Sequence, residues 1–177
     1  MLLKLIILGL LCEGDRHPYE VLQTMKERQM QNYIKINFGT LYYNFEQLLK
    51  KGAIEVREVI HEEKRPDKTI YRITDKGRQR FRELLQKQLF ADTKLYHPLY
   101  PPLMFLRFAD PVMVRDAMLQ QRQHTVERIA HIKQVMAEFD CDAVWTPLQI
   151  MKNGLMHSET ELEWIDGFLQ EMEERGM

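Results

Sequence analysis

Cysteine is scarce in this chain, which has only Cys12 and Cys141 among its 177 residues. Two distant cysteines without a metal-ligand spacing give neither a zinc site nor a disulfide framework. We therefore expect the reducing cytoplasm as the setting. Because Cys12 lies among leucine and isoleucine residues, a buried structural thiol is the favoured interpretation. A thiol-based redox sensor is the weakest functional hypothesis.

Long hydrophobic runs are also missing. The longest apolar stretch, residues 2–12, is too short to span a bilayer. No basic run precedes this stretch and no small-residue cleavage site follows it, so it lacks the pattern of a signal peptide. The stretch predicts a core helix, and we expect no membrane partner.

Signatures of catalysis are absent as well. The sequence contains no glycine-rich phosphate loop, no His-Glu-x-x-His and no nucleophile elbow. Glu127 and His131 lie four residues apart, as do His157 and Glu161. Such pairs more often form a surface contact than a metal site. We expect a protein that is not an enzyme and holds neither a metal nor a cofactor.

Charge is nearly balanced over the whole chain but not within it. The formal net charge is −1, yet residues 1–90 hold 17 Lys and Arg against 12 Asp and Glu, and residues 91–177 hold 8 against 14. The two parts therefore carry +5 and −6. This asymmetry indicates that only the front part binds a polyanion.

The sequence does contain a short helix, at residues 37–52, with clear start and stop signals. Asn37 is a candidate N-cap and Gly52 a candidate C′ residue in the left-handed region. The predicted buried stripe consists of Leu41, Phe45, Leu48 and Leu49. The other face carries hydrogen-bonding side chains with little negative charge, which suits the major groove of DNA. The candidates for groove contacts are Thr40, Tyr43, Asn44 and Gln47.

A charged hairpin is predicted directly after this helix. Residues 53–60 and 69–73 have the pattern of two strands, joined by a turn at residues 61–68. The cations of the turn have the length and charge to reach phosphates or the minor groove; they are Lys64, Arg65 and Lys68. The helix alone is better interpreted as an ordinary helix with a solvated face, and the hairpin and the charge asymmetry reverse that preference.

Helices are also predicted before and after these elements. Residues 2–12 form the first, and a second begins at Pro18 after a cap at Asp15 or His17 and fades near Gln31. The second helix is expected to bury Val21, Leu22 and Met25. A helix capped by Thr74 follows the hairpin, with one face formed by Phe81, Leu84, Leu85 and Leu89. Helix, helix, helix, hairpin is the order of a winged helix-turn-helix.

A proline cluster at residues 96–102 stops regular structure and marks the predicted domain boundary. We expect a winged helix-turn-helix DNA-binding domain at residues 1–90, a Pro-rich linker with a short helix at 91–110, and a helical domain at 111–177. The fold class is mainly α with a small β-hairpin wing. Long helices are predicted to about Phe139 and to about Glu174. The second of these has a heptad pattern formed by Leu148, Met151, Leu155, Leu162, Ile165, Leu169 and Met172.

Several spaced motifs within residues 2–88 carry a resemblance to a known family. They are Leu5-Ile6-Ile7-Leu8-Gly9-Leu10-Leu11-Cys12-Glu13-Gly14, His17-Pro18-Tyr19-Glu20, Gly39-Thr40-Leu41-Tyr42, Leu48 with Gly52-Ala53-Ile54, and Tyr71-Arg72-Ile73-Thr74-Asp75-Lys76-Gly77. In this order they resemble the PadR family of bacterial transcriptional regulators, which are winged-helix dimers. The chain departs from the family pattern at Asn37-Phe38, where Ser-Pro is common, and at Pro18, where Gly is usual.

The resemblance implies a cytoplasmic repressor that binds an inverted-repeat operator in double-stranded DNA as a homodimer. It implies that residues 111–177, with their heptad pattern, form the dimerisation domain. Further candidate DNA contacts are Tyr19, Lys35, Asn37, Gly39 and Tyr42. Some family members respond to small hydrophobic or phenolic effectors. The candidate effector site here consists of Tyr96, His97, Tyr100 and Trp145.

Two alternatives remain open at this stage. The modest charge of the front part is also compatible with a protein-interaction module that retains the winged-helix fold without DNA readout. The heptad pattern is also compatible with a helical hairpin within one chain.

Overall fold

The computed structural model describes residues 2–28, 30, 34, 38–62, 65–92, 96–138 and 145–176. The chain divides into two compact units, Met1–Lys94 and Leu95–Met177, which we call the first and the second unit. In the described part of the chain, no helix combines the length and apolarity that a membrane span requires.

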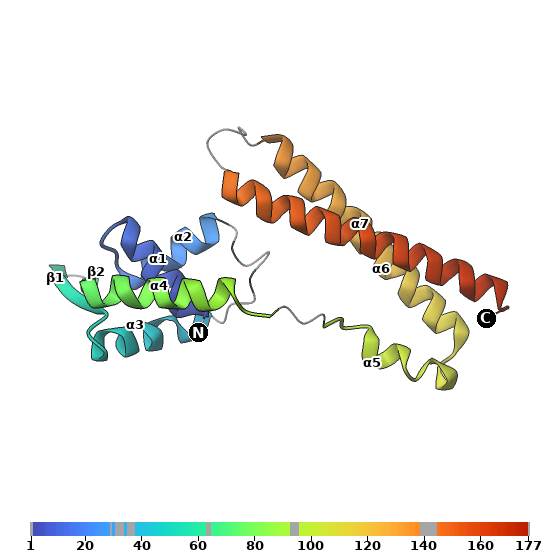
Figure 1. Ribbon diagram of the computed structural model, residues 1–177, viewed down its shortest axis with the longest axis horizontal. Coiled ribbons are helices and arrows are strands. Elements are labelled where there is room, and N and C mark those ends of the chain that lie inside the picture. The colour runs from blue at the N-terminus through green and yellow to red at the C-terminus, as the bar shows by residue number, and fades with distance from the viewer. Residues whose placement is uncertain are drawn as a thin grey trace. The chain divides into compact units, whose positions relative to one another are not determined.

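The first unit has the order of a winged helix-turn-helix (Figure 1). Its elements are α1 (Leu2–Glu13), α2 (Pro18–Glu27), the 3-10 turn η2 (Phe38–Thr40), α3 (Leu41–Lys50), β1 (Ile54–Glu62), β2 (Arg65–Ile73) and α4 (Asp75–Leu89). The second unit consists of α5 (Tyr100–Leu103), η3 (Leu106–Phe108), α6 (Pro111–Glu138) and α7 (Trp145–Glu174). The predicted fold class, mainly α with a small β-hairpin, is confirmed.

The core of the first unit forms around α1, whose apolar residues pack against α3, α4 and β2. Burying each aliphatic side chain contributes about 1.5–3 kcal/mol. The fully buried residues include Ile7, Leu8, Leu11, Val21, Met25, Leu41, Phe45 and Leu48, while Leu22 is partly buried. Cys12 also packs partly buried against this core, and Cys141 lies outside the described residues.

Leu49 was predicted in the buried stripe of α3, and this was wrong, because its side chain is 37% exposed. One residue turns a helix by about 100°, which carries Leu49 past the edge of the stripe that Leu48 occupies. The predicted apolar face of α4 is also only partly correct. Leu84 is buried and Phe81 is partly buried, whereas Leu85 and Leu89 are exposed.

The hairpin is longer than predicted, and most of the predicted turn at residues 61–68 is strand. β1 and β2 pair antiparallel from Ile54 with Ile73 to Glu62 with Arg65, with irregularities in register after Val56 and after Ile60. Charged residues continue the ladder because a two-stranded hairpin projecting into solvent needs no apolar face along its outer half.

In the second unit α6 and α7 pack side by side as an antiparallel pair (Figure 1). The core of this pair is formed by Val114, Met118, Ile165 and Met172. The register is reinforced by ion pairs from basic residues of α6 to acidic residues of α7: Arg115 with Glu173 at 2.9 Å, Arg122 with Asp166 at 2.6 Å and Lys133 with Glu159 at 2.9 Å.

The segment that was predicted as a linker packs against this helical pair. Leu99, Leu106 and Ala109 contact the core of the second unit. The expectation that the prolines stop regular structure was wrong for two of them, because Pro101 and Pro102 lie in the first turn of α5. Proline is tolerated there, since the first N–H groups of a helix have no partner within it.

Candidate nucleic-acid interface

The outer face of α3 is aromatic and polar. Tyr42 and Tyr43 are 55% and 59% exposed, and Gly39 and Thr40 are exposed in the preceding turn. Asn44 and Gln47 are half-buried along the same helix. This face offers several hydrogen-bonding groups and two aromatic rings to a groove.

Asn44 is held by a bond within α3. Its Nδ2 donates a hydrogen bond to the carbonyl oxygen of Thr40 at 2.7 Å. The side chain therefore lies along the helix, with one amide hydrogen used and Oδ1 still able to accept. A bidentate contact to adenine needs one donor and one acceptor, and both remain on this amide.

The predicted cap of the recognition helix, Asn37, lies outside the described residues, as do Lys35 and Lys64 and the side chain of Arg65. The end of the helix follows the prediction. Gly52 has a φ of 65° and takes the C′ position after α3.

The remaining wing candidate, Lys68, lies on β2 and is turned towards α2. Its Nζ lies 2.8 Å from Oε1 of Glu20, in the first turn of α2. The ring of Tyr19, beside Glu20, is 59% exposed. The start of α2 and the hairpin thus lie close enough to form one continuous surface.

The N-terminus of α2 is closed by a capping box. Of the two predicted caps, His17 fills the role: its Nδ1 accepts a hydrogen bond from the backbone N–H of Tyr19 at 3.1 Å. In return, Glu20 Oε2 accepts from the backbone N–H of His17 at 2.8 Å. Burial is the main cause that lowers the pKa of His17, and the positive charge of Lys68 is the second. The lowered pKa keeps the ring neutral, so Nδ1 can accept a hydrogen bond.

Asp15, the other predicted cap, instead fixes the hairpin. Its Oδ2 lies 3.0 Å from Arg72 Nη2 on β2 and also pairs with Arg57 on β1. The hydrogen bond from Arg72 is the largest cause that keeps the pKa of Asp15 below its ordinary value. Beside it, Arg16 and Tyr71 exchange two backbone hydrogen bonds of 3.1 Å and 3.0 Å. The loop between α1 and α2 therefore anchors both strands of the wing.

A second anchor joins the hairpin to α4. Thr74 Oγ1 donates to the carbonyl oxygen of Gly52 at 2.7 Å and accepts from the backbone N–H of Gly77 at 3.1 Å. The N–H of Thr74 also donates to the carbonyl oxygen of Ala53 at 3.1 Å. Gly77 lies so close to Ala53 that a Cβ on it would be 1.9 Å from that oxygen. The motifs at residues 52–54 and 71–77 thus meet in space.

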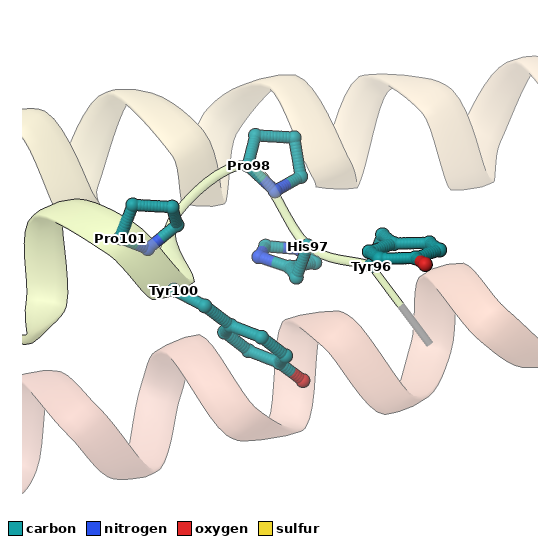
Figure 2. Close-up of a pocket in the computed structure, with 5 residues that line it drawn as sticks. All are labelled: Tyr96, His97, Pro98, Tyr100 and Pro101. Atoms are coloured by element: carbon teal, nitrogen blue, oxygen red, sulfur yellow. The ribbon is translucent and has the colours of Figure 1, made fainter. Parts of the chain in front are cut away.

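Three of the four predicted effector residues come together in the second unit. A cavity of about 380 Å³ is lined by Tyr96, His97, Pro98, Tyr100 and Pro101 (Figure 2). The pocket is wide open to solvent, so a ligand there would stay partly exposed. Trp145 does not line it and is 69% exposed at the start of α7.

The imidazole of His97 is fixed by two polar contacts. Nε2 lies 3.0 Å from Glu161 Oε1 on α7, and Nδ1 accepts from the backbone N–H of Leu99 at 3.3 Å. The rings of Tyr100 and Trp164 flank it, with centroids 5.1 Å and 5.8 Å away. Glu161 was expected to pair with His157, and the structure places it against His97. In the described part of the chain, no cluster of three metal-ligating side chains occurs.

The predicted dimerisation residues divide into two groups. Leu148, Ile165 and Met172 are buried within the chain, the last two in the core shared with α6. The remaining four are half-buried on α7; they are Met151, Leu155, Leu162 and Leu169. Exposed apolar side chains lie nearby in sequence, among them Ile150 and Met156 at 43% and 66% exposure.

Known proteins agree with this architecture. Residues 7–83 match the transcriptional regulator PadR-like family. The fold is similar to that of Bacillus subtilis PadR in complex with operator DNA, with a TM-score of 0.77, 17% identity, and 97% of this chain and 99% of that chain covered. The same protein in complex with p-coumaric acid gives a TM-score of 0.79, 17% identity, and 98% and 99% coverage.

A third similar structure is the Vibrio cholerae virulence activator AphA, with a TM-score of 0.73, 17% identity, and 98% of this chain and 99% of that chain covered. No curated protein sequence matches the chain. At these identities the solved structures establish the fold, and the match of residues 7–83 is to a family of transcriptional regulators. Residues 7–83 are thus similar to the PadR-like family of transcriptional regulators, and solved PadR structures share the fold of nearly the whole chain.

Proposed function

We propose that this regulator binds an inverted-repeat operator as a homodimer, with α3 in the major groove and the hairpin on the adjacent backbone, and that it represses transcription from the bacterial cytoplasm. The exposed aromatic and polar face of α3 supports this proposal most directly. The two anchors of the hairpin support it further, because a wing held at Asp15 and Thr74 keeps a fixed position beside α3.

Groove contacts are tested by substituting the face of α3 one residue at a time. Gln47→Ala removes a side chain that can bind adenine, and it should cost about 1–3 kcal/mol on the preferred sequence and relax the preference at one base pair. Tyr43→Phe removes only a hydroxyl. Gln120→Ala on α6, in the second unit, is the control, because it also removes an exposed amide without changing the charge. Operator affinity that is equal in all three variants would remove α3 from the interface.

Dimerisation is proposed through the half-buried leucines of α7. When α6 and α7 pack only against each other, each helix buries a single apolar stripe. A second copy of the chain would cover the apolar side chains that remain exposed. Leu162→Glu should yield monomers in sedimentation analysis. Thr160→Glu is the matched control, because it lies about 200° around the same helix. Equal dimerisation in both variants would contradict the proposal.

A phenolic or small apolar effector is proposed for the cavity beside His97. The aromatic and proline lining gives apolar contact, and the fixed imidazole gives a polar group that orients a ligand. Binding there would change the separation of the two recognition helices, which must match half-sites about 34–36 Å apart.

The effector proposal is tested with a panel of phenolic acids. One member should release operator DNA from the wild type and not from Tyr100→Ala, while Trp145→Ala, outside the cavity, should respond like the wild type. If both variants respond normally, the cavity is not the effector site. Transcription from an operator-fused reporter determines the sign of regulation: expression that falls when the protein is supplied supports repression, and expression that rises refutes it.

A further inference from the structure

The carboxylate of Glu20 uses both of its oxygen atoms at the start of α2. Oε2 accepts from the backbone N–H of His17 at 2.8 Å, and Oε1 lies 2.8 Å from Lys68 Nζ on the hairpin. The first bond is part of the capping box, so it holds the carboxylate in place whether or not Lys68 is bound. A fixed anion therefore faces a lysine of the wing.

This anion binds Lys68 by the same chemistry that a DNA phosphate would use. An ammonium group makes charge-assisted hydrogen bonds to carboxylate and phosphate oxygens alike. The side chains of Lys68 and Glu20 are 37% and 42% exposed, so an incoming strand can reach the pair. The hydrogen bond from Lys68 is the largest cause that lowers the pKa of Glu20 below its ordinary value, and the hydrogen bond from the N–H of His17 is the next. The carboxylate therefore keeps its charge at neutral pH.

We propose that Glu20 limits the DNA affinity of the wing by competing with the phosphate backbone for Lys68. The inference rests on the proposed DNA-binding role of the hairpin. In the free protein the charge of Lys68 is cancelled locally. On DNA, Lys68 exchanges the carboxylate for a phosphate, while Glu20 stays bound to His17 and opposes the approaching strand. The motif His17-Pro18-Tyr19-Glu20 thereby sets DNA affinity in addition to starting a helix.

Glu20→Gln tests this with little change in shape. Glutamine keeps the oxygen that accepts from the N–H of His17, and it serves equally in a capping box. The readout is the affinity for a non-operator duplex at several salt concentrations. Affinity at fixed salt should rise about two- to fivefold per wing, the strength typical of an exposed ion pair. The slope of log affinity against log salt should steepen, because in the wild type the carboxylate that Lys68 leaves takes up a cation and offsets part of the counterion release, whereas the glutamine takes up none.

Glu83→Gln is the matched control. It removes one carboxylate from the same unit and frees Arg80, which lies 2.9 Å from Glu83 on α4. A rise in DNA affinity that comes only from the change in net charge would be the same in both variants. A larger rise for Glu20→Gln, with both melting temperatures close to that of the wild type, supports the competition.

Lys68→Ala, alone and combined with Glu20→Gln, completes a double-mutant cycle. In the wild-type background Lys68 gives up Glu20 when it binds phosphate, so its removal costs less affinity than in the Glu20→Gln background. Equal costs in the two backgrounds, or equal gains for Glu20→Gln and Glu83→Gln, overturn the inference and leave the proposed function intact. Wild-type protein without salt-dependent DNA affinity would instead refute the function itself.

Discussion

A single methyl group at Gly77 is expected to weaken the junction between the hairpin and α4. A Cβ on Gly77 would lie 1.9 Å from the carbonyl oxygen of Ala53 and 2.7 Å from Cγ1 of Ile73. Ala53 and Ile73 are only 3% and 4% exposed, so neither has free space to move into. Gly77→Ala therefore forces the first turn of α4 away from the base of the hairpin.

The magnitude follows from three contributions. Ordinary contact begins near 3.4 Å, so α4 must shift by roughly 1.5 Å, and such overpacking costs about 1–3 kcal/mol. The shift also breaks the bond from Thr74 N–H to the Ala53 carbonyl, which costs about 0.5–1.5 kcal/mol. The better helix propensity of alanine offsets about 1 kcal/mol. The net loss is about 0.5–3.5 kcal/mol, which at about 4–8 °C per kcal/mol lowers the melting temperature of a domain this size by roughly 2–28 °C.

Thermal unfolding followed by two probes measures this loss. Circular dichroism reports both units, while tryptophan fluorescence reports the second unit, which contains both Trp145 and Trp164. Gly167→Ala is the control, because its Cβ would meet no atom within 4 Å and only helix propensity acts there. It should raise the melting temperature slightly. Equal shifts for Gly77→Ala and Gly167→Ala would refute the reasoning.

Three further results are expected from the first unit. Thr74→Ala removes the hydroxyl that caps α4 and donates to the preceding turn; urea unfolding should show a loss of about 1–2 kcal/mol, and an unchanged midpoint would contradict it. Asp15→Asn should speed amide hydrogen exchange at Tyr71, whose N–H bonds to the adjoining loop; unchanged exchange would contradict a clamp there. The folded-state pKa values of Glu13, Asp15 and Glu20 lie below their ordinary values, so the stability they contribute is complete above about pH 4.5. This stability should be lost as the pH falls through the folded-state pKa values, and acid unfolding followed by circular dichroism measures the loss. Stabilisation of the protein on acidification would refute the expectation.

Local periodicity allowed much of the fold to be predicted from the sequence. The stripe of Leu41, Phe45 and Leu48 and the glycine at position 52 define α3 without any tertiary information. The length of the hairpin was not predictable in the same way, because its outer residues are largely charged and show no alternation of apolar and polar side chains. Leu49 shows the same limit, since a residue at the edge of a stripe is buried only if a neighbour covers it.

The candidate site was predictable as a set of residue types and not as a set of contacts. The exposed tyrosines of α3 follow from helix geometry. The pairs of Asp15 with Arg72 and of Glu20 with Lys68 join residues far apart in sequence. Either acid is equally suited to cap a helix or to remain in solvent, so its partner emerges only when the hairpin folds against the loop between α1 and α2.

The central claim is sequence-specific recognition of DNA by a dimer through α3 and the hairpin. The most direct test is an anisotropy titration of the protein against a randomised DNA pool at several salt concentrations, followed by sequencing of the tightest fraction. We predict enrichment of an inverted repeat and affinity that falls steeply with salt. Weak binding that enriches no sequence at any salt concentration would contradict the claim.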